Sequence, residues 1–118
     1  MEAAHLLGTG GAIGAVLRYL VDQKLAHDRF PISTLVVNVV GSFALGLVVF
    51  VGFSHEAVLF VGTGACGSFT TYSSFSVQTV QLWETGDRVQ AVIYAGGTLS
   101  SCLLAAGGAV GIAMVLPF

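Results

Sequence analysis

Three hydrogen-bonding side chains recur at helical spacing inside an apolar stretch of this sequence. Thr34, Asn38 and Ser42 stand four residues apart among Val and Phe residues, so on a helix they lie along one face. The carboxamide of Asn38 must find a partner in such apolar surroundings. A single Asn on its own favours a bridge between two helices. A second polar face nearby shifts the interpretation toward a path for a solute.

That second face lies in the segment that contains Tyr72 and Phe75. The two aromatic residues stand three positions apart, and Ser76 and Thr79 lie one helical turn farther along. The stripe offers hydroxyl donors and the electropositive edges of two rings. Together with the amide of Asn38, these groups supply hydrogen-bond donors without a fixed carboxylate or a buried Lys.

Such donors favour a small anion. An ion must bind well enough to enter a path and weakly enough to leave it, and the absence of Lys satisfies the second condition. Arg18, near the end of the first apolar stretch, is placed to draw anions to a vestibule on one side. The sequence therefore predicts a transport path suited to a small anion.

The uncharged run between Glu56 and Glu84 is too long and too polar for one ordinary transmembrane helix. At about 1.5 Å per residue it would span roughly 40 Å as a continuous helix, more than the hydrocarbon core of about 30 Å. Its middle, residues 62–79, reads GTGACGSFTTYSSFSVQT and is rich in Gly, Ser and Thr. We expect the helix to break there, where its backbone groups face protein or a cavity.

Composition and hydropathy indicate a single membrane domain over residues 1–118. Hydrophobic residues make up 55% of the chain and charged residues 8%, and the mean hydropathy is +0.90. Ordinary soluble domains carry roughly 25% charged residues. Apolar spans at residues 4–25, 30–53, 57–83 and 89–118 predict an all-α membrane protein with four transmembrane helices. The low content of Lys and Arg makes nucleic acid an improbable partner.

Small residues at four-residue spacing predict close packing between helices. They are Gly10 and Gly14, Gly97 with Ser101 and Ala105, and Gly107 with Gly111. Cys66 and Cys102 lie within apolar spans and lack His or carboxylate partners at ligand spacing, so we interpret them as packing residues.

Four other classes of function fit the sequence less well. Gly62, Gly64 and Gly67 imitate a dinucleotide-binding fingerprint, but no βαβ unit surrounds them. A small dual-topology multidrug exporter needs a carboxylate within its spans, whereas the Glu residues flank them. A non-transporting assembly subunit leaves the polar third span unexplained. A hydrolytic enzyme needs His or a carboxylate near an intramembrane Ser, so we expect no enzyme.

Three motifs in order resemble the successive signatures of the CrcB/Fluc fluoride channels. They are residues 10–19 (GGAIGAVLRY), residues 34–43 (TLVVNVVGSF) after Pro31, and residues 66–76 (CGSFTTYSSFS). The resemblance covers nearly the whole chain and implies a passive, fluoride-selective channel that exports fluoride across the cell membrane. It also implies a dual-topology dimer of two antiparallel four-helix subunits, with two narrow pores along their interface.

The resemblance further implies the residues of the site. The fluoride pore is expected to include Asn38, Tyr72, Phe75, Ser74, Thr79 and Tyr94. Backbone carbonyls of Gly67 and Thr70 are expected to hold a structural Na⁺ on the dimer axis. Two positions depart from the family pattern, with Tyr72 in place of the usual Phe and Gln78 in place of a common Glu. The first adds a hydroxyl that needs a partner, and the second removes a titratable group.

Basic residues are distributed unevenly between the two sides of the predicted membrane domain. Lys24, Arg29 and Arg88 fall on one side, with Arg18 if it reaches the interface, whereas the side of the termini carries no Lys or Arg. The positive-inside rule then predicts that most copies insert with both termini outside. The minority orientation would suffice for an antiparallel homodimer, which we favour. A heterodimer with an oppositely oriented homologue is the alternative.

Overall fold

The computed structural model describes residues 2–25 and 30–115, and every regular element in them is a helix. Three of the helices are long and apolar enough to cross a membrane. They are α1 (Ala3–Leu25), α2 (Ile32–Val51) and α6 (Arg88–Val115). These bounds match three of the predicted spans within a few residues. The connection at residues 26–29 and the end of the fourth span at residues 116–118 lie outside the described residues.

The third predicted span is a succession of shorter helices. α3 (His55–Ala57) leads into the π-helix η1 (Val58–Cys66), which continues into α4 (Gly67–Phe69). Thr70 (φ -83°, ψ 161°) and Thr71 (φ -149°, ψ 123°) are extended, and α5 (Tyr72–Glu84) begins after them. The glycines therefore remain helical, and the extended backbone falls on two threonines.

Local signals set the ends of several of these helices. Gly52 ends α2 with a positive φ of 92°, a conformation that glycine adopts without strain. The side chain of Ser54 accepts a hydrogen bond from the backbone N–H of Ala57, and that of Thr71 accepts one from Ser74 at the start of α5. Both are N-caps that satisfy an otherwise unpaired helix donor.

Glycines on α1 allow it to contact η1 backbone to backbone. A Cβ atom added to Gly10 would overlap the carbonyl oxygen of Phe60, and one added to Gly14 would overlap that of Ala65. No side chain fits at either position. The predicted close packing of the Gly10 and Gly14 face is thus observed. By contrast, Cβ atoms on Gly97, Gly107 and Gly111 would meet no atom within 4 Å.

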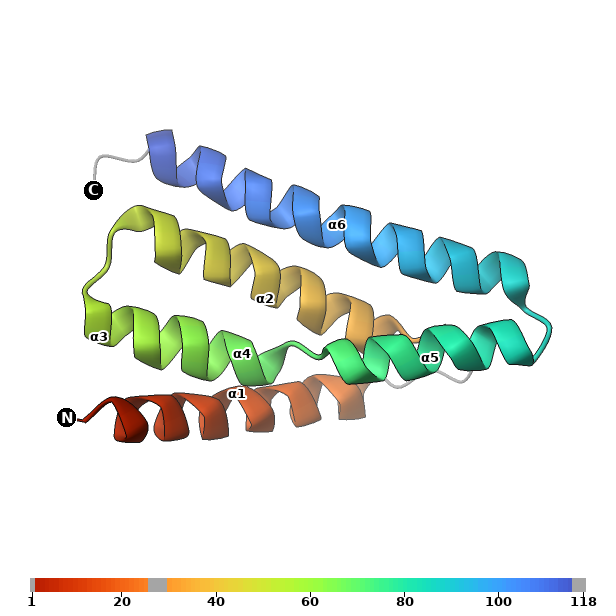
Figure 1. The fold of residues 1–118 in the computed structure, drawn as a ribbon, viewed down its shortest axis with the longest axis horizontal. Coiled ribbons are helices and arrows are strands. Elements are labelled where there is room, and N and C mark those ends of the chain that lie inside the picture. Colours follow the sequence, from red (N-terminus) through yellow and green to blue (C-terminus); the bar gives the residue numbers. More distant parts are fainter. Residues whose placement is uncertain (1, 26–29, 116–118) are drawn as a thin grey trace.

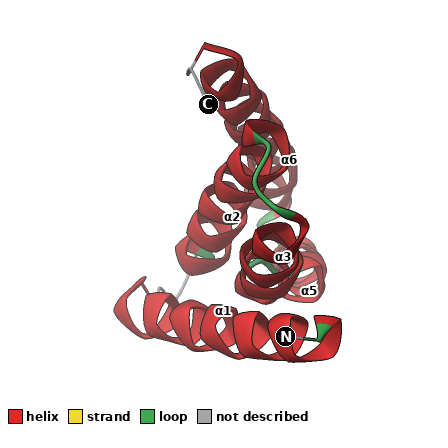
Figure 2. Cartoon of the chain, turned by 90° about the vertical axis from the view of Figure 1, so that its left-hand side faces the viewer, coloured by secondary structure: helices red, strands yellow, loops and turns green. Residues whose placement is uncertain are grey.

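The other side of the molecule is built by α2, α5 and α6. Figure 1 shows α2 running beside α6, and Figure 2 shows α1 crossing beneath the helices of the third span. Gly46 lets α2 approach Ala106 and Ala109 of α6. A small core joins Leu82 of α5 to Ala91 and Tyr94 of α6.

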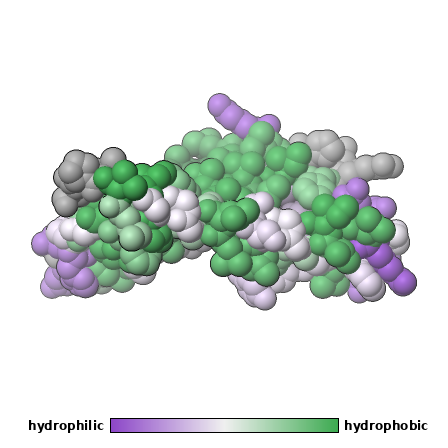
Figure 3. Space-filling view, turned by 90° about the horizontal axis from the view of Figure 1, so that it is seen from above, coloured by the Kyte–Doolittle hydropathy of each residue, from purple (hydrophilic) through white to green (hydrophobic). Residues whose placement is uncertain are grey.

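The surface is apolar over most of its length. In the face drawn in Figure 3, hydrophobic residues dominate, and hydrophilic residues gather mainly toward the two ends. α1 begins and α6 ends at the same end of the molecule in Figure 1, as an even number of crossings requires. Many large apolar side chains of α6 are exposed, including Leu103 and Leu104. A bilayer or another subunit must cover such a surface.

Candidate functional site

Of the two extended threonines, Thr71 is held by Asn38, which lies in the first half of α2. The side-chain nitrogen of Asn38 donates to the carbonyl oxygen of Thr71 at 3.0 Å, and the backbone N–H of Thr71 donates to Oδ1 of Asn38 at 2.8 Å. One carboxamide thus satisfies both backbone groups of a residue outside the helix. An amide nitrogen carries two hydrogens, so a second N–H of Asn38 remains for another acceptor.

In the same arrangement, two N–H groups that would donate to backbone carbonyls in a continuous helix donate to side chains instead. In a continuous α-helix, the carbonyl of Gly67 would accept from the N–H of Thr71 and that of Thr70 from Ser74. The N–H of Thr71 instead donates to Asn38, and the N–H of Ser74 donates to Oγ1 of Thr71 at 3.2 Å. Gly67 and Thr70 therefore present carbonyl oxygens that lack their normal helical partners.

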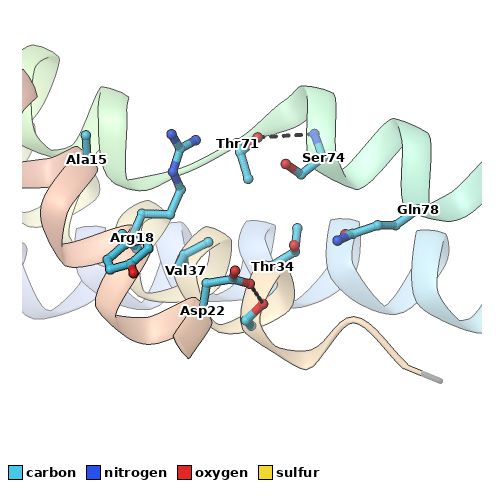
Figure 4. Close-up of a pocket in the computed structure, with 10 residues that line it drawn as sticks. Ala15, Arg18, Asp22, Thr34, Val37, Thr71, Ser74 and Gln78 are labelled. Atoms are coloured by element: carbon cyan, nitrogen blue, oxygen red, sulfur yellow. Dashed lines mark hydrogen bonds between the residues drawn. The ribbon is translucent and has the colours of Figure 1, made fainter. Parts of the chain in front are cut away.

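A polar pocket, here called the Arg18 pocket, lies on the α1 side of this junction. It has a volume of about 330 Å³ and is lined by Arg18, Asp22, Ser33, Thr34, Ser74 and Gln78, among others. In Figure 4 the Arg18 side chain extends from α1 toward the segment that carries Thr71. Gln78 reaches into the pocket from α5. Within residues 2–25 and 30–115, the lining combines one guanidinium, one carboxylate and several neutral hydrogen-bonding groups.

A second pocket, here called the Asn38 pocket, lies on the α6 side. It has a volume of about 280 Å³, and its lining includes Asn38, Ser42, Tyr72, Phe75, Thr98 and Cys102. Thr71 lines both pockets. The junction of Asn38 and Thr71 is therefore the point where the two pockets approach each other.

Aromatic rings pack beside the Asn38 pocket. The ring centroids of Tyr72 and Phe75 lie 6.1 Å apart, and those of Phe75 and Tyr94 lie 5.3 Å apart. Phe30 meets Tyr94 edge to face, with centroids 5.4 Å apart. Tyr94 is fully buried, and its hydroxyl donates to Oε1 of Gln78 at 3.0 Å. Tyr72 is 81% exposed, so its ring projects from the surface of the single chain.

The predicted site residues are distributed between the Arg18 pocket, the Asn38 pocket and positions outside both. Arg18 and Ser74 line the Arg18 pocket, whereas Asn38, Tyr72, Phe75 and Thr70 line the Asn38 pocket. The face predicted on α2 is shared between the two, because Thr34 lines the first pocket and Ser42 the second. Thr79, Tyr94 and Gly67 line neither of these two pockets. The Thr79 hydroxyl donates to the carbonyl oxygen of Phe75 at 2.7 Å.

Several lining residues were missed by the sequence reasoning. Thr98 is 4% exposed, and its hydroxyl has no hydrogen-bond partner among the described residues. Tyr94, Thr98 and Cys102 follow one another at four-residue spacing on α6, and this periodicity was the signal that could have found Thr98. Asp22 and Ser33 come from different helices, and no local pattern links them.

Comparison with known proteins places this arrangement in a family. The family described as "CrcB-like protein, Camphor Resistance (CrcB)" matches residues 5–112. A protein of Haloarcula marismortui named "Fluoride-specific ion channel FluC 2" is 50% identical over 98% of this chain and 98% of its own length. A protein of Halobacterium salinarum named "Fluoride-specific ion channel FluC 1" is 46% identical over 96% of this chain and 92% of its own.

A bacterial relative shows the same likeness over a shorter stretch. A protein of Agrobacterium fabrum named "Fluoride-specific ion channel FluC" is 51% identical over 69% of this chain and 71% of its own length. These relatives are named as ion channels and not as enzymes, as the sequence predicts for this chain. With a family match over most of its length and close relatives of the same size, this membrane protein belongs to the CrcB/Fluc family.

Proposed function

We propose that this chain is a multi-pass protein of the cell membrane that conducts fluoride passively and so exports it from the cell. Relatives that are named fluoride-specific ion channels cover nearly its whole length. The observation that carries the proposal is the Asn38 and Thr71 junction, which lies where two pockets approach each other and leaves one amide N–H of Asn38 without an acceptor among the described residues. Neutral donors suit a small, strongly hydrated anion that must both bind and leave.

The proposed path begins in the Arg18 pocket. The guanidinium attracts the anion, and the hydroxyl of Ser74 lies in the same lining to replace part of the lost hydration. The anion then passes Asn38 and the rings of Tyr72 and Phe75. Ring edges carry partial positive charge, so an anion approaching edge-on is stabilised without a fixed cation.

Thr79 and Tyr94 belong to this path through their contacts with its lining. Thr79 donates to the carbonyl of Phe75, and the ring of Tyr94 packs on Phe75. The hydroxyl of Tyr94 also holds the Gln78 oxygen, which leaves the amide nitrogen of Gln78 as a donor. We assign both residues to the pore, where they support the orientation of Phe75 and Gln78. Thr98 is an additional donor beside the Asn38 pocket.

We further propose that the carbonyl oxygens of Gly67 and Thr70 hold a structural Na⁺ at a dimer interface. Both carbonyls have lost their normal helical donors, as described above. Neutral, hard oxygen ligands of this kind suit an alkali cation. Gly67 is exposed on the single chain, and a Cβ there would meet no atom within 4 Å. When bound, the ion would supply a fixed positive charge that ties the two subunits together.

The proposed assembly is an antiparallel, dual-topology homodimer. Tyr72 is 81% exposed and Leu104 76% exposed on the single chain, and the glycines of α6 face open space. A second copy would cover such a surface and complete the site around Tyr72. Pairing with an oppositely oriented homologue is the alternative, because the chain carries an uneven distribution of basic residues.

Fluoride efflux from liposomes tests the function. The purified chain is reconstituted into vesicles loaded with potassium fluoride, efflux is started with a potassium ionophore, and released fluoride is read with an ion-selective electrode. Vesicles loaded with potassium chloride are the control. We expect rapid fluoride release and almost no chloride release. Equal release of both ions, or none of either, would refute the proposal.

A further inference from the structure

Among the described residues, one carboxylate lines the Arg18 pocket, and it is held by a neighbouring helix. This contact affects the charge that the pocket presents. We propose that Ser33 is a positioning residue that keeps the Asp22 carboxylate away from Arg18, so that the guanidinium stays available to an anion. The inference rests on the proposed function, because the anion is taken to pass through the Arg18 pocket.

Helical spacing by itself would favour a different pairing. Arg18 and Asp22 stand four residues apart on α1, the spacing at which opposite charges attract each other along a helix. In Figure 4 the guanidinium of Arg18 instead extends toward the segment that carries Thr71. The carboxylate of Asp22 is hydrogen-bonded to α2, and no hydrogen bond joins it to Arg18 among the residues drawn.

The hydroxyl of Ser33 explains this arrangement. Its Oγ donates to Oδ1 of Asp22 at 2.8 Å. Ser33 is buried in the first turn of α2, so its short side chain has little freedom left to lose. A hydrogen bond from such a group to a carboxylate is stronger than a charge pair at four-residue spacing on one helix. Asp22 therefore remains with Ser33.

As a result, the guanidinium of Arg18 is a positive charge in this pocket that is not paired with Asp22. The other lining groups named above, Thr34, Ser74 and Gln78, are neutral. An Arg18 that paired with Asp22 would present a compensated charge and attract an anion less strongly. Removing the Ser33 hydroxyl frees Asp22 to turn toward Arg18, its natural partner at four-residue spacing.

Three variants test this account by fluoride efflux at low fluoride concentration. Ser33→Ala should slow efflux roughly two- to threefold, the size expected from an ion pair at a partly exposed site. Asp22→Asn keeps an acceptor for Ser33 and removes the competing charge, so efflux should equal or exceed that of the wild type. The double variant Ser33→Ala with Asp22→Asn should recover the lost rate. Thr9→Ala, which removes an exposed hydroxyl from α1 at a position that lines neither pocket, is the matched control.

Ionic strength gives a second readout. N-methylglucamine gluconate at about 0.5 M, added equally to both sides of the membrane, shortens the Debye length and screens Arg18 without changing the potassium gradient, so it should slow the wild type toward the rate of Ser33→Ala. The variant itself should respond less. A merely structural effect of Ser33 would leave the salt response unchanged.

The outcomes separate the inference from the proposed function. A wild type that releases no fluoride refutes the proposed function and the inference with it. An active wild type with an equally active Ser33→Ala variant refutes the inference alone. The inference also fails if the double variant is as slow as Ser33→Ala, since the loss then does not act through Asp22. Recovery in the double variant together with the weakened salt response supports the inference.

Discussion

At the scale of single residues, Asn38 combines a structural and a proposed conducting role. Its carboxamide satisfies the N–H and the carbonyl of Thr71, and its remaining N–H is the donor assigned to the anion. The sequence predicted a polar Asn with a partner. It could not identify Thr71 as that partner, because the two residues are far apart in the chain and meet only after α2 packs beside the third span.

We predict that Asn38→Ala reduces fluoride efflux at least tenfold and destabilises the protein by roughly 2–4 kcal/mol, since two buried peptide groups lose their partners. Efflux from liposomes and thermal unfolding in detergent measure the two effects. Gln90→Ala removes an exposed carboxamide from α6 and serves as the matched control. Near-normal efflux from Asn38→Ala would remove Asn38 from the pore.

A second prediction at this scale concerns the aromatic pair. Phe75→Ile should impair efflux more than Tyr72→Phe, because it deletes a ring edge and the contacts of that ring with Tyr72 and Tyr94. Tyr72→Phe removes only a hydroxyl from an exposed ring. Initial efflux rates of the two variants at equal protein content decide the order. If Tyr72→Phe is the slower variant, the hydroxyl itself is a ligand.

At the scale of elements, the sequence predicted four apolar spans, and α1, α2 and α6 lie where three of them were expected. The glycines of the third span were a misleading signal for its extended residues. Gly62 and Gly64 stay within η1, and only Gly64 is tightly packed, since a Cβ there would lie 3.1 Å from backbone atoms of Leu7 and Gly10 in α1. The extended residues are Thr70 and Thr71, whose conformation depends on a distant partner, Asn38.

The glycine contact between α1 and η1 yields a prediction for matched variants. Gly14→Ala should prevent normal folding or lower stability by at least about 2 kcal/mol, since its Cβ would overlap the Ala65 carbonyl. Gly8→Ala lies on the same helix with no atom within 4 Å, and should be neutral or stabilising by up to about 1 kcal/mol. Yield of monodisperse protein and thermal unfolding provide the comparison. Equal behaviour of both variants would argue against the close approach of α1 to η1.

At the scale of the whole molecule, the single chain leaves a large apolar surface and an exposed Tyr72. The sequence alone cannot tell whether lipid or a second subunit covers this surface, because surfaces that face lipid and interfaces between subunits are both apolar. The antiparallel dimer is proposed because the sequence resembles the CrcB/Fluc channels. The distribution of basic residues gives a separate expectation about orientation in the membrane, since Lys24 and Arg88 lie on the side opposite the termini.

We predict that most copies insert with both termini outside while a minority insert in the opposite sense. A single cysteine introduced at Ser54 in a background without Cys66 and Cys102 reports the orientation through a membrane-impermeant thiol reagent. Partial labelling in intact cells, with the remainder labelled after permeabilisation, supports the homodimer. A single orientation, together with fluoride transport only after co-expression of a homologue, would favour the heterodimer.

The central claim, passive and selective conduction of fluoride, is tested most directly by a reversal potential. The purified chain is incorporated into a planar bilayer with a tenfold gradient of fluoride and an opposite tenfold gradient of chloride. We predict a current that reverses close to the fluoride equilibrium potential, about 59 mV in magnitude for a monovalent ion, independent of any pH gradient. A reversal at the chloride potential, or one that follows the proton gradient, would contradict the account.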